Sequence, residues 1–228
     1  MRLNNRRVGL AAAVLVVAGI TVARAGALPS WQPARFVGGS IPQPGTIAVG
    51  GGEVLLEVTV SERGGLTNVR PLRVTPPFAD MLIAAIRGWD FSPAIDASAR
   101  GASPATPLRV ASKVLVGAVF RPPAMVGPTL GETPKNVGRA GNDVPFPLTT
   151  TMPVYPTHAR SGASVLVELH VGTDGAVTDA TVVQSAPPFD EPARSAALAW
   201  RFRPAVVDGR AVESLVYIVF GFPTPVLG

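Results

Sequence analysis

The sequence predicts an α+β protein built as two tandem small domains, each a β-β-α-β unit with a three-stranded antiparallel sheet and one helix packed on a face. Residues 51–94 align without a gap on residues 162–205, at a shift of 111 and with about 15 identities in 44 positions. In both stretches, alternating apolar side chains indicate strands, and an apolar stripe at helical spacing indicates one helix. The period is far too long for a solenoid, so we interpret the chain as two copies of one domain.

The hairpin of the second copy is predicted by its alternation and by its turn. Residues 164–171 place apolar side chains on one face and polar ones, including Glu168, on the other, which predicts a half-buried strand. Asp174 and Gly175 tolerate positive φ and predict a tight turn. A second strand is then expected at about 176–184, and a proline pair ends it.

One helix follows each hairpin. In the second copy, Asp190 is expected to cap a helix at 191–201. Its apolar stripe repeats at i, i+4, i+7, i+8 and i+11 and ends at Trp200, and the first copy has the same stripe ending at Trp89. We therefore expect both tryptophans to lie in hydrophobic cores.

The last strand of the second copy is expected at 214–222, after a turn at Asp208 and Gly209. Its counterpart in the first copy is residues 113–120, which we align on residues 213–220 at a shift of 100. The smaller shift leaves about eleven extra residues in one loop of the first copy.

The N-terminus has the pattern of a secretory signal peptide. Arginines precede an uncharged run of about 16 residues from Val8 to Ala23, and an A-x-A cleavage pattern follows at 23–25. The run is shorter than the ~20 residues of a spanning helix, although an uncleaved membrane anchor is the alternative. We divide the chain into signal peptide or anchor, N-terminal connector, first copy, Pro/Gly-rich linker and second copy: 1–25, 26–50, 51–120, 121–152 and 153–228.

Composition excludes several classes of function. The chain has 20 basic and 15 acidic residues, but four arginines lie in the leader, so the rest is nearly neutral and does not indicate a nucleic-acid binder. There is no cysteine, and the histidines His158 and His170 lie on a connector and on a strand, without the spacing of a metal site. We expect no catalytic, metal or cofactor residues, and no enzyme.

Two matched glutamates stand on the polar faces of the first strands. Glu57 and Glu168 occupy equivalent positions in the two copies. We expect plain surface charges, with pairing to a partner or to a neighbouring arginine as the alternative.

The second copy carries several short motifs in a fixed order: PVYPTHAR at 153–160, TDGAV at 173–177, WRFRPA at 200–205 and a closing Phe220. In this order and spacing they resemble the C-terminal domain of TonB-family energy transducers. The first copy resembles the same domain more weakly, because it keeps the Trp-x-Phe-x-Pro-Ala stretch but lacks the Tyr-Pro entry and the Asp-Gly turn.

The resemblance implies a periplasmic module that binds protein segments in TonB-dependent uptake. Domains of this family add a short peptide of an outer-membrane transporter as an extra strand to their sheet. An exposed sheet edge suits that mode because its backbone N–H and C=O groups are unpaired. We expect the last strand to be this edge, with its side chains in the core and its backbone binding the partner through Ser214, Leu215, Val216, Tyr217, Ile218, Val219 and Phe220.

Three alternatives remain open from the sequence. A retained leader would make the protein an energy transducer anchored in the inner membrane and coupled to motor proteins there. The fold could also serve envelope scaffolding without a transporter partner. Finally, exposed edges allow a homodimer, or the two copies could pack into one continuous sheet, which would hide the expected binding edge.

Overall fold

The structure, a computed structural model, describes residues 31–44, 50–97, 108–122 and 134–225. The predicted signal peptide or anchor at 1–25 lies outside the described residues. Across the described ranges, no helix has the length and apolar character needed to cross a membrane.

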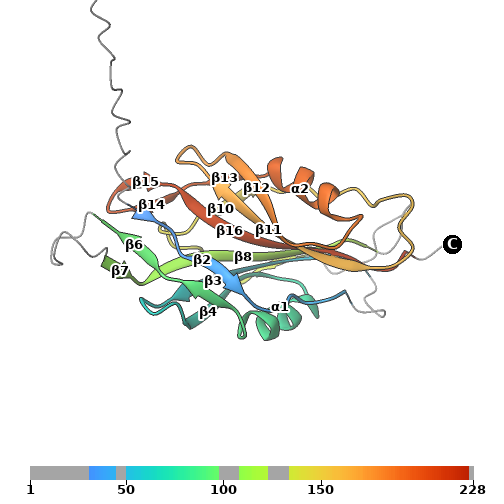
Figure 1. The fold of residues 1–228 in the computed structure, drawn as a ribbon, viewed down its shortest axis with the longest axis horizontal. Coiled ribbons are helices and arrows are strands. Elements are labelled where there is room, and N and C mark those ends of the chain that lie inside the picture. Colours follow the sequence, from blue (N-terminus) through green and yellow to red (C-terminus); the bar gives the residue numbers. More distant parts are fainter. Residues whose placement is uncertain (1–30, 45–49, 98–107, 123–133, 226–228) are drawn as a thin grey trace, which may run out of the picture.

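One seven-stranded sheet runs through the centre of the molecule (Figure 1). In spatial order its strands are β12 (Val177–Gln184), β11 (Ala163–Val171), β16 (Ser214–Phe222), β8 (Ser112–Phe120), β3 (Gly52–Val60), β4 (Leu66–Val74) and β9 (Lys135–Asn136). Neighbouring strands pair antiparallel, except β16 and β8, which pair parallel at the centre.

The predicted strand-strand-helix-strand order is present in both halves, but the two halves do not form separate sheets. Each half contributes three antiparallel strands, and the last strands of the two halves join them. In the register of this joint, Val216 lies beside Leu115 and Gly221 beside Phe120. The expected arrangement of two independent three-stranded sheets is therefore wrong, and the alternative of one continuous sheet describes the molecule.

The two helices among the described residues lie on opposite faces of the sheet (Figure 1). α1 (Phe78–Ile86) covers the first half and α2 (Asp190–Leu198) the second. Because β8 and β16 run parallel, the two halves are related by a rotation of 180° about an axis parallel to these strands. This rotation exchanges the two faces of the sheet, so the helices of the two halves lie on opposite faces. α2 is shorter than expected, and Asp190 does not cap it: its carboxylate accepts instead from the backbone N–H of Ala186.

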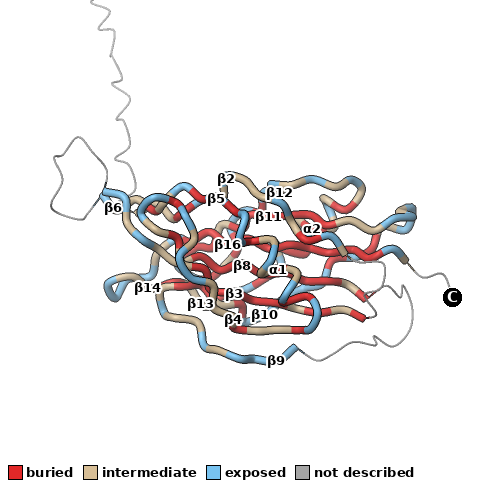
Figure 2. The backbone as a smooth tube through the Cα atoms, turned by 90° about the horizontal axis from the view of Figure 1, so that it is seen from below, coloured by how far each residue is buried: buried red, intermediate tan, exposed pale blue. Residues whose placement is uncertain are grey.

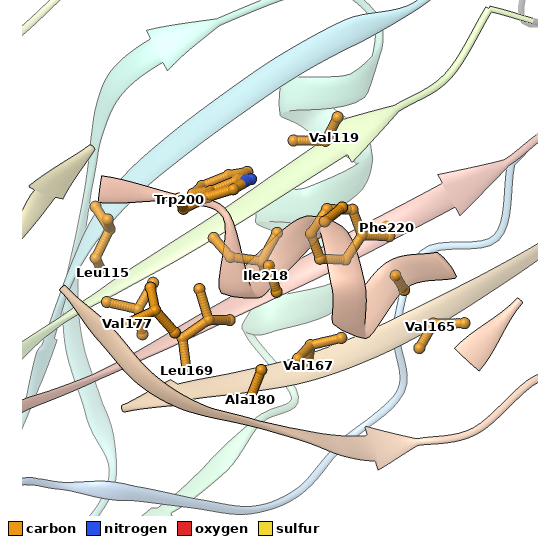
Figure 3. Close-up of a cluster of buried hydrophobic side chains, with 14 of the residues drawn as sticks. Leu115, Val119, Val165, Val167, Leu169, Val177, Ala180, Trp200, Ile218 and Phe220 are labelled. Atoms are coloured by element: carbon orange, nitrogen blue, oxygen red, sulfur yellow. The ribbon is translucent and has the colours of Figure 1, made fainter. Parts of the chain in front are cut away.

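Each face of the sheet has a hydrophobic core that draws side chains from both halves. The core below α2 contains Trp200 together with Leu115 and Val119 of β8 (Figure 3). The core below α1 contains Trp89 together with Tyr217 of β16. The expectation that both tryptophans are core residues is confirmed, since they are 3% and 0% exposed.

The central strands are buried on both faces, as Figure 2 shows for the middle of the sheet. The expectation of a half-buried strand at 164–171 is wrong, because side chains of the other half cover its second face. Glu57 and Glu168 are not surface charges either, since they are 3% and 2% exposed.

Hydrogen bonds at matched positions show how closely the halves correspond. Trp89 Nε1 donates to Ser40 O at 2.8 Å, and Trp200 Nε1 donates to Thr151 O at 3.0 Å, 49 residues earlier in both cases. The last strands correspond differently than the sequence alignment suggests. Phe120 pairs with Gly52 as Phe222 pairs with Ala163, which sets the shift at 102 instead of 100.

Four short sheets surround the central one. They are β1 (Trp31–Gln32) with β6 (Ala94–Asp96) and β7 (Leu108–Val110), β2 (Arg35–Gly38) with β5 (Asp90–Ser92), β10 (Phe146–Thr149) with β13 (Arg201–Arg203), and β14 (Ala205–Val207) with β15 (Arg210–Val212). β1, β2, β9 and β10 come from the two segments that the sequence assigns to connectors. In their described parts, these segments are therefore integral to the packed structure.

The segment before each half packs on the hairpin of the other half. In the first segment, Pro42 O accepts from the buried hydroxyl of Ser164, and Gly39 O accepts from Gln184 Nε2. In the second segment, Gly141 N donates to Glu57 at 3.0 Å. These crossed contacts hold the two halves together independently of the central strands.

Candidate functional site

The strand predicted to bind a partner is the innermost strand of the second half. β16 pairs with β11 along its whole length on one side and with β8 on the other. All its residues are buried, which confirms the core assignment of their side chains. The expected edge position is wrong, because β8 of the first half occupies the side where a peptide would have to add.

The open edge of the second half is β12. It is the last strand of the seven-stranded order, and none of the described residues pairs as a strand with its outer side. Arg194 of α2 donates to Ala180 O at 3.2 Å and so covers part of this edge. Beyond that point, Val183 leaves 37% of its surface exposed at the edge.

The corresponding edge of the first half is β4, and the chain covers it with its own strand β9. Arg73 lies opposite Asn136, and Val137 N donates to Leu72 O at 2.9 Å. Gly138 N makes a second, longer bond of 3.2 Å to the same carbonyl. Among the described residues, the sheet therefore has one covered and one uncovered example of the same edge.

A β-bulge at the same position makes the two edges comparable residue by residue. In β4 the pairing with β3 shifts at Leu72, between Pro71 and Arg73, and in β12 the pairing with β11 shifts at Val183. Leu72 is fully buried in the core below α2, whereas its counterpart Val183 is exposed. The side chain of Leu72 also lies close to residue 138, since a Cβ atom on Gly138 would meet it at 3.5 Å.

A buried polar network ties the first segment to the second half. Glu168 accepts from Arg35 at 2.6 and 3.2 Å, from the Tyr217 hydroxyl at 2.8 Å, and lies 3.2 Å from His170 Nε2. Tyr217 in turn accepts from the backbone N–H of Phe36 at 2.8 Å. Burial raises the pKa of the Tyr217 phenol far above its ordinary value, so the hydroxyl stays protonated and donates to Glu168.

The matching glutamate of the first half has a network of its own. Glu57 accepts from Arg70 at 2.6 and 3.2 Å and from Gly141 N, and Lys113 lies 3.7 Å away. Lys113 also pairs with Asp143 at 2.9 Å. Burial acts to raise the pKa of Glu57, but these donors and positive charges outweigh it and hold the pKa below its ordinary value. Both glutamates are thus positioned to bind arginine, the alternative that the sequence left open.

A cleft of about 480 Å³ opens near the start of β12. Its ionisable lining residues are Arg35, Arg109, His170 and Glu213, and Thr178 of β12 also contributes. Across the described ranges, no three His, Asp or Glu side chains group in a way that could hold a metal ion. The chemistry of this region is that of polar contact and backbone pairing.

A family comparison fits this half of the molecule. Residues 151–222 match the family of the Gram-negative bacterial TonB protein C-terminal. The match supports a TonB C-terminal domain in the second half and associates it with protein interaction in TonB-dependent transport at the Gram-negative envelope. Among curated proteins, no sequence matches this chain.

The TonB C-terminal match begins just after β10 and ends with β16, so it contains the open edge β12 and the enclosed strand β16. Sequence reasoning placed the open edge of the sheet on the wrong one of these two strands. A signal for the correct order was present: residues 214–222 are apolar on both faces, as in a strand buried on both sides, whereas 177–184 carry three polar residues in the first five.

Proposed function

We propose that this protein is a periplasmic binding module of TonB-dependent uptake that captures segments of outer-membrane transporters by β-strand addition, and that it is not an enzyme. The observation that carries the proposal is the open edge of β12 in the half that matches the TonB C-terminal family. An added strand supplies affinity through main-chain hydrogen bonds, and its alternate side chains supply specificity.

We further propose that residues 51–120 are a second, divergent copy of the same domain, adapted to a structural role. The repeated element order, the matched tryptophan bonds and the paired glutamates support this origin. Its β8 strand lies along β16, and its β4 edge is covered by β9. Within the seven-stranded sheet, β12 is then the long edge strand that the described residues leave open.

The proposal predicts where a transporter segment binds. In an NMR titration, synthetic peptides that copy transporter N-terminal segments should shift the backbone amides of residues 181–185 and leave those of 214–222 unchanged. A peptide of the same length with prolines at alternate positions should not bind, because proline has no N–H to donate to the edge.

Two outcomes would contradict the proposal. A well-dispersed spectrum that does not change at millimolar peptide would favour envelope scaffolding without a transporter partner. Shifts concentrated in 214–222 would mean that β16 can leave β8 and that the acceptor edge is the central strand.

A further inference from the structure

The contact between β4 and β9 is an intramolecular example of strand addition to this type of edge. β9 runs antiparallel to β4, with Val74 opposite Lys135 and Arg73 opposite Asn136. The segment then passes over the bulge, where Leu72 O accepts hydrogen bonds from the backbone N–H groups of Val137 and Gly138. The contact is short, and the bulge defines its register.

The residue that passes over the bulge must be small. A Cβ atom on Gly138 would lie 2.8 Å from Pro71 O, closer than real Cβ atoms approach backbone oxygens. It would also meet the Leu72 side chain at 3.5 Å. Glycine is therefore required where the added strand crosses the bulge, since any larger residue would push the strand away from its acceptor carbonyl.

Only the first part of this contact has a counterpart on β12. Val182, Val183 and Gln184 correspond to Pro71, Leu72 and Arg73, including the bulge. Past the bulge the halves differ, because the oxygens of Glu168 are already occupied by Arg35 and Tyr217, whereas Glu57 accepts from the covering segment. The part of the covering segment that could bind β12 in the same way is therefore the four-residue stretch at 135–138.

We infer that β12 binds an extended partner segment antiparallel to itself, registered at Gln184 and Ser185, with a glycine crossing the bulge at Val183. The choice of edge rests on the proposed function, but the direction, the register and the glycine come from the covered edge of the first half. Val183 is the exposed apolar side chain at this bulge that such a segment would contact.

At the equivalent sequence position, the chain has an alanine in place of the glycine that crosses the bulge. At the shift of 111, Gly138 corresponds to Ala27 and Val137 to Gly26. An alanine at the crossing position would bring its Cβ against the carbonyl of Val182, the counterpart of the Pro71 carbonyl that a Cβ on Gly138 would meet. This mismatch favours a segment supplied by a partner.

The covering segment itself provides the probe. The acetylated and amidated octapeptide PKNVGRAG, which copies residues 134–141, is titrated into the full-length protein and followed by NMR. We expect saturable amide shifts at Val182, Val183, Gln184 and Ser185 at millimolar peptide. The peptide PKNVARAG should bind at least fivefold more weakly, because only its glycine is changed.

Two protein variants locate the contact. Val183→Asp places a charge at the exposed edge and should weaken binding at least fivefold. Val154→Asp is the matched control, because Val154 is also exposed, at 76%, and lies outside β12. Equal binding by both variants, or by both peptides, would overturn the inference.

Other occupants of the edge give distinct results. Shifts of the same four amides on raising the protein concentration without peptide would assign the edge to a second copy of this chain. Slow hydrogen exchange of these amides in the free monomer would assign it to residues of the same chain. Either result overturns the inference. Binding of PKNVGRAG without binding of transporter peptides would instead refute the proposed function and leave the edge geometry intact.

Discussion

Replacing Tyr217 by phenylalanine removes one hydroxyl that makes two hydrogen bonds in the buried centre of the sheet. The hydroxyl donates to Glu168 at 2.8 Å and accepts from Phe36 N at 2.8 Å. Both Tyr217 and Glu168 are at most 2% exposed, so water cannot replace the lost partner. The ring itself stays in place, and the change therefore isolates the polar network.

The expected loss follows from these two bonds. A buried hydrogen bond to a charged group contributes about 1.5–3 kcal/mol, and a backbone N–H left without a partner costs about 1–3 kcal/mol. Because the two effects share one atom and the β2 segment can relax, we expect Tyr217→Phe to lower the free energy of unfolding by about 3 kcal/mol. Urea unfolding followed by tryptophan fluorescence measures this value.

Tyr155→Phe is the matched control. Its hydroxyl donates a single neutral bond to Ser161 O at 3.0 Å, which predicts a loss of about 1 kcal/mol. If the two variants have the same stability within about 0.5 kcal/mol, the network around Glu168 does not connect the first segment to the second half as we argue.

The remaining predictions concern the cores, a turn and acid stability. Trp200→Ala should lower the free energy of unfolding by about 3–5 kcal/mol, and circular dichroism should show a single transition for both halves, because they share one sheet; two separate transitions would contradict the shared core. Gly175→Ala should destabilise more than Gly209→Ala in thermal melts: both have positive φ, but only at Gly175 would a Cβ meet a backbone oxygen, Phe202 O. Glu57 has a lowered pKa in the fold, so its contribution to stability is complete above its ordinary pKa of 4.5 and is lost as the pH falls through the folded pKa. Urea titrations at several pH values should therefore show a smaller acid loss for Glu57→Gln than for the wild type, and equal losses would show that Glu57 does not cause it.

The local elements could be predicted from sequence because their signals are local. The Asp174-Gly175 turn forms the β11–β12 hairpin, with Gly175 at φ +80°. The helical stripes place Phe78 and Phe189 in the cores. These features depend on neighbours a few residues away, which the pattern of side chains describes directly.

The pairing of β8 with β16, which joins the two halves, could not be predicted in this way, because pairing between distant strands leaves no local pattern in the sequence. The continuous apolar run of 215–220 indicates burial on both faces but does not identify the neighbouring strand. The burial of Glu168 also depends on Arg35, a residue 133 positions earlier. The open edge of β12 is therefore a property of the assembled sheet.

Hydrogen exchange of the backbone amides in the full-length protein tests the central claim most directly, namely that β16 is enclosed and β12 is open. We expect the amides of β16 to be among the slowest to exchange, because both sides of the strand are paired. The outer amides of β12 should exchange much faster and become protected when a strand-adding peptide is present. Fast exchange throughout β16, with slow exchange along the outer side of β12, would contradict the account.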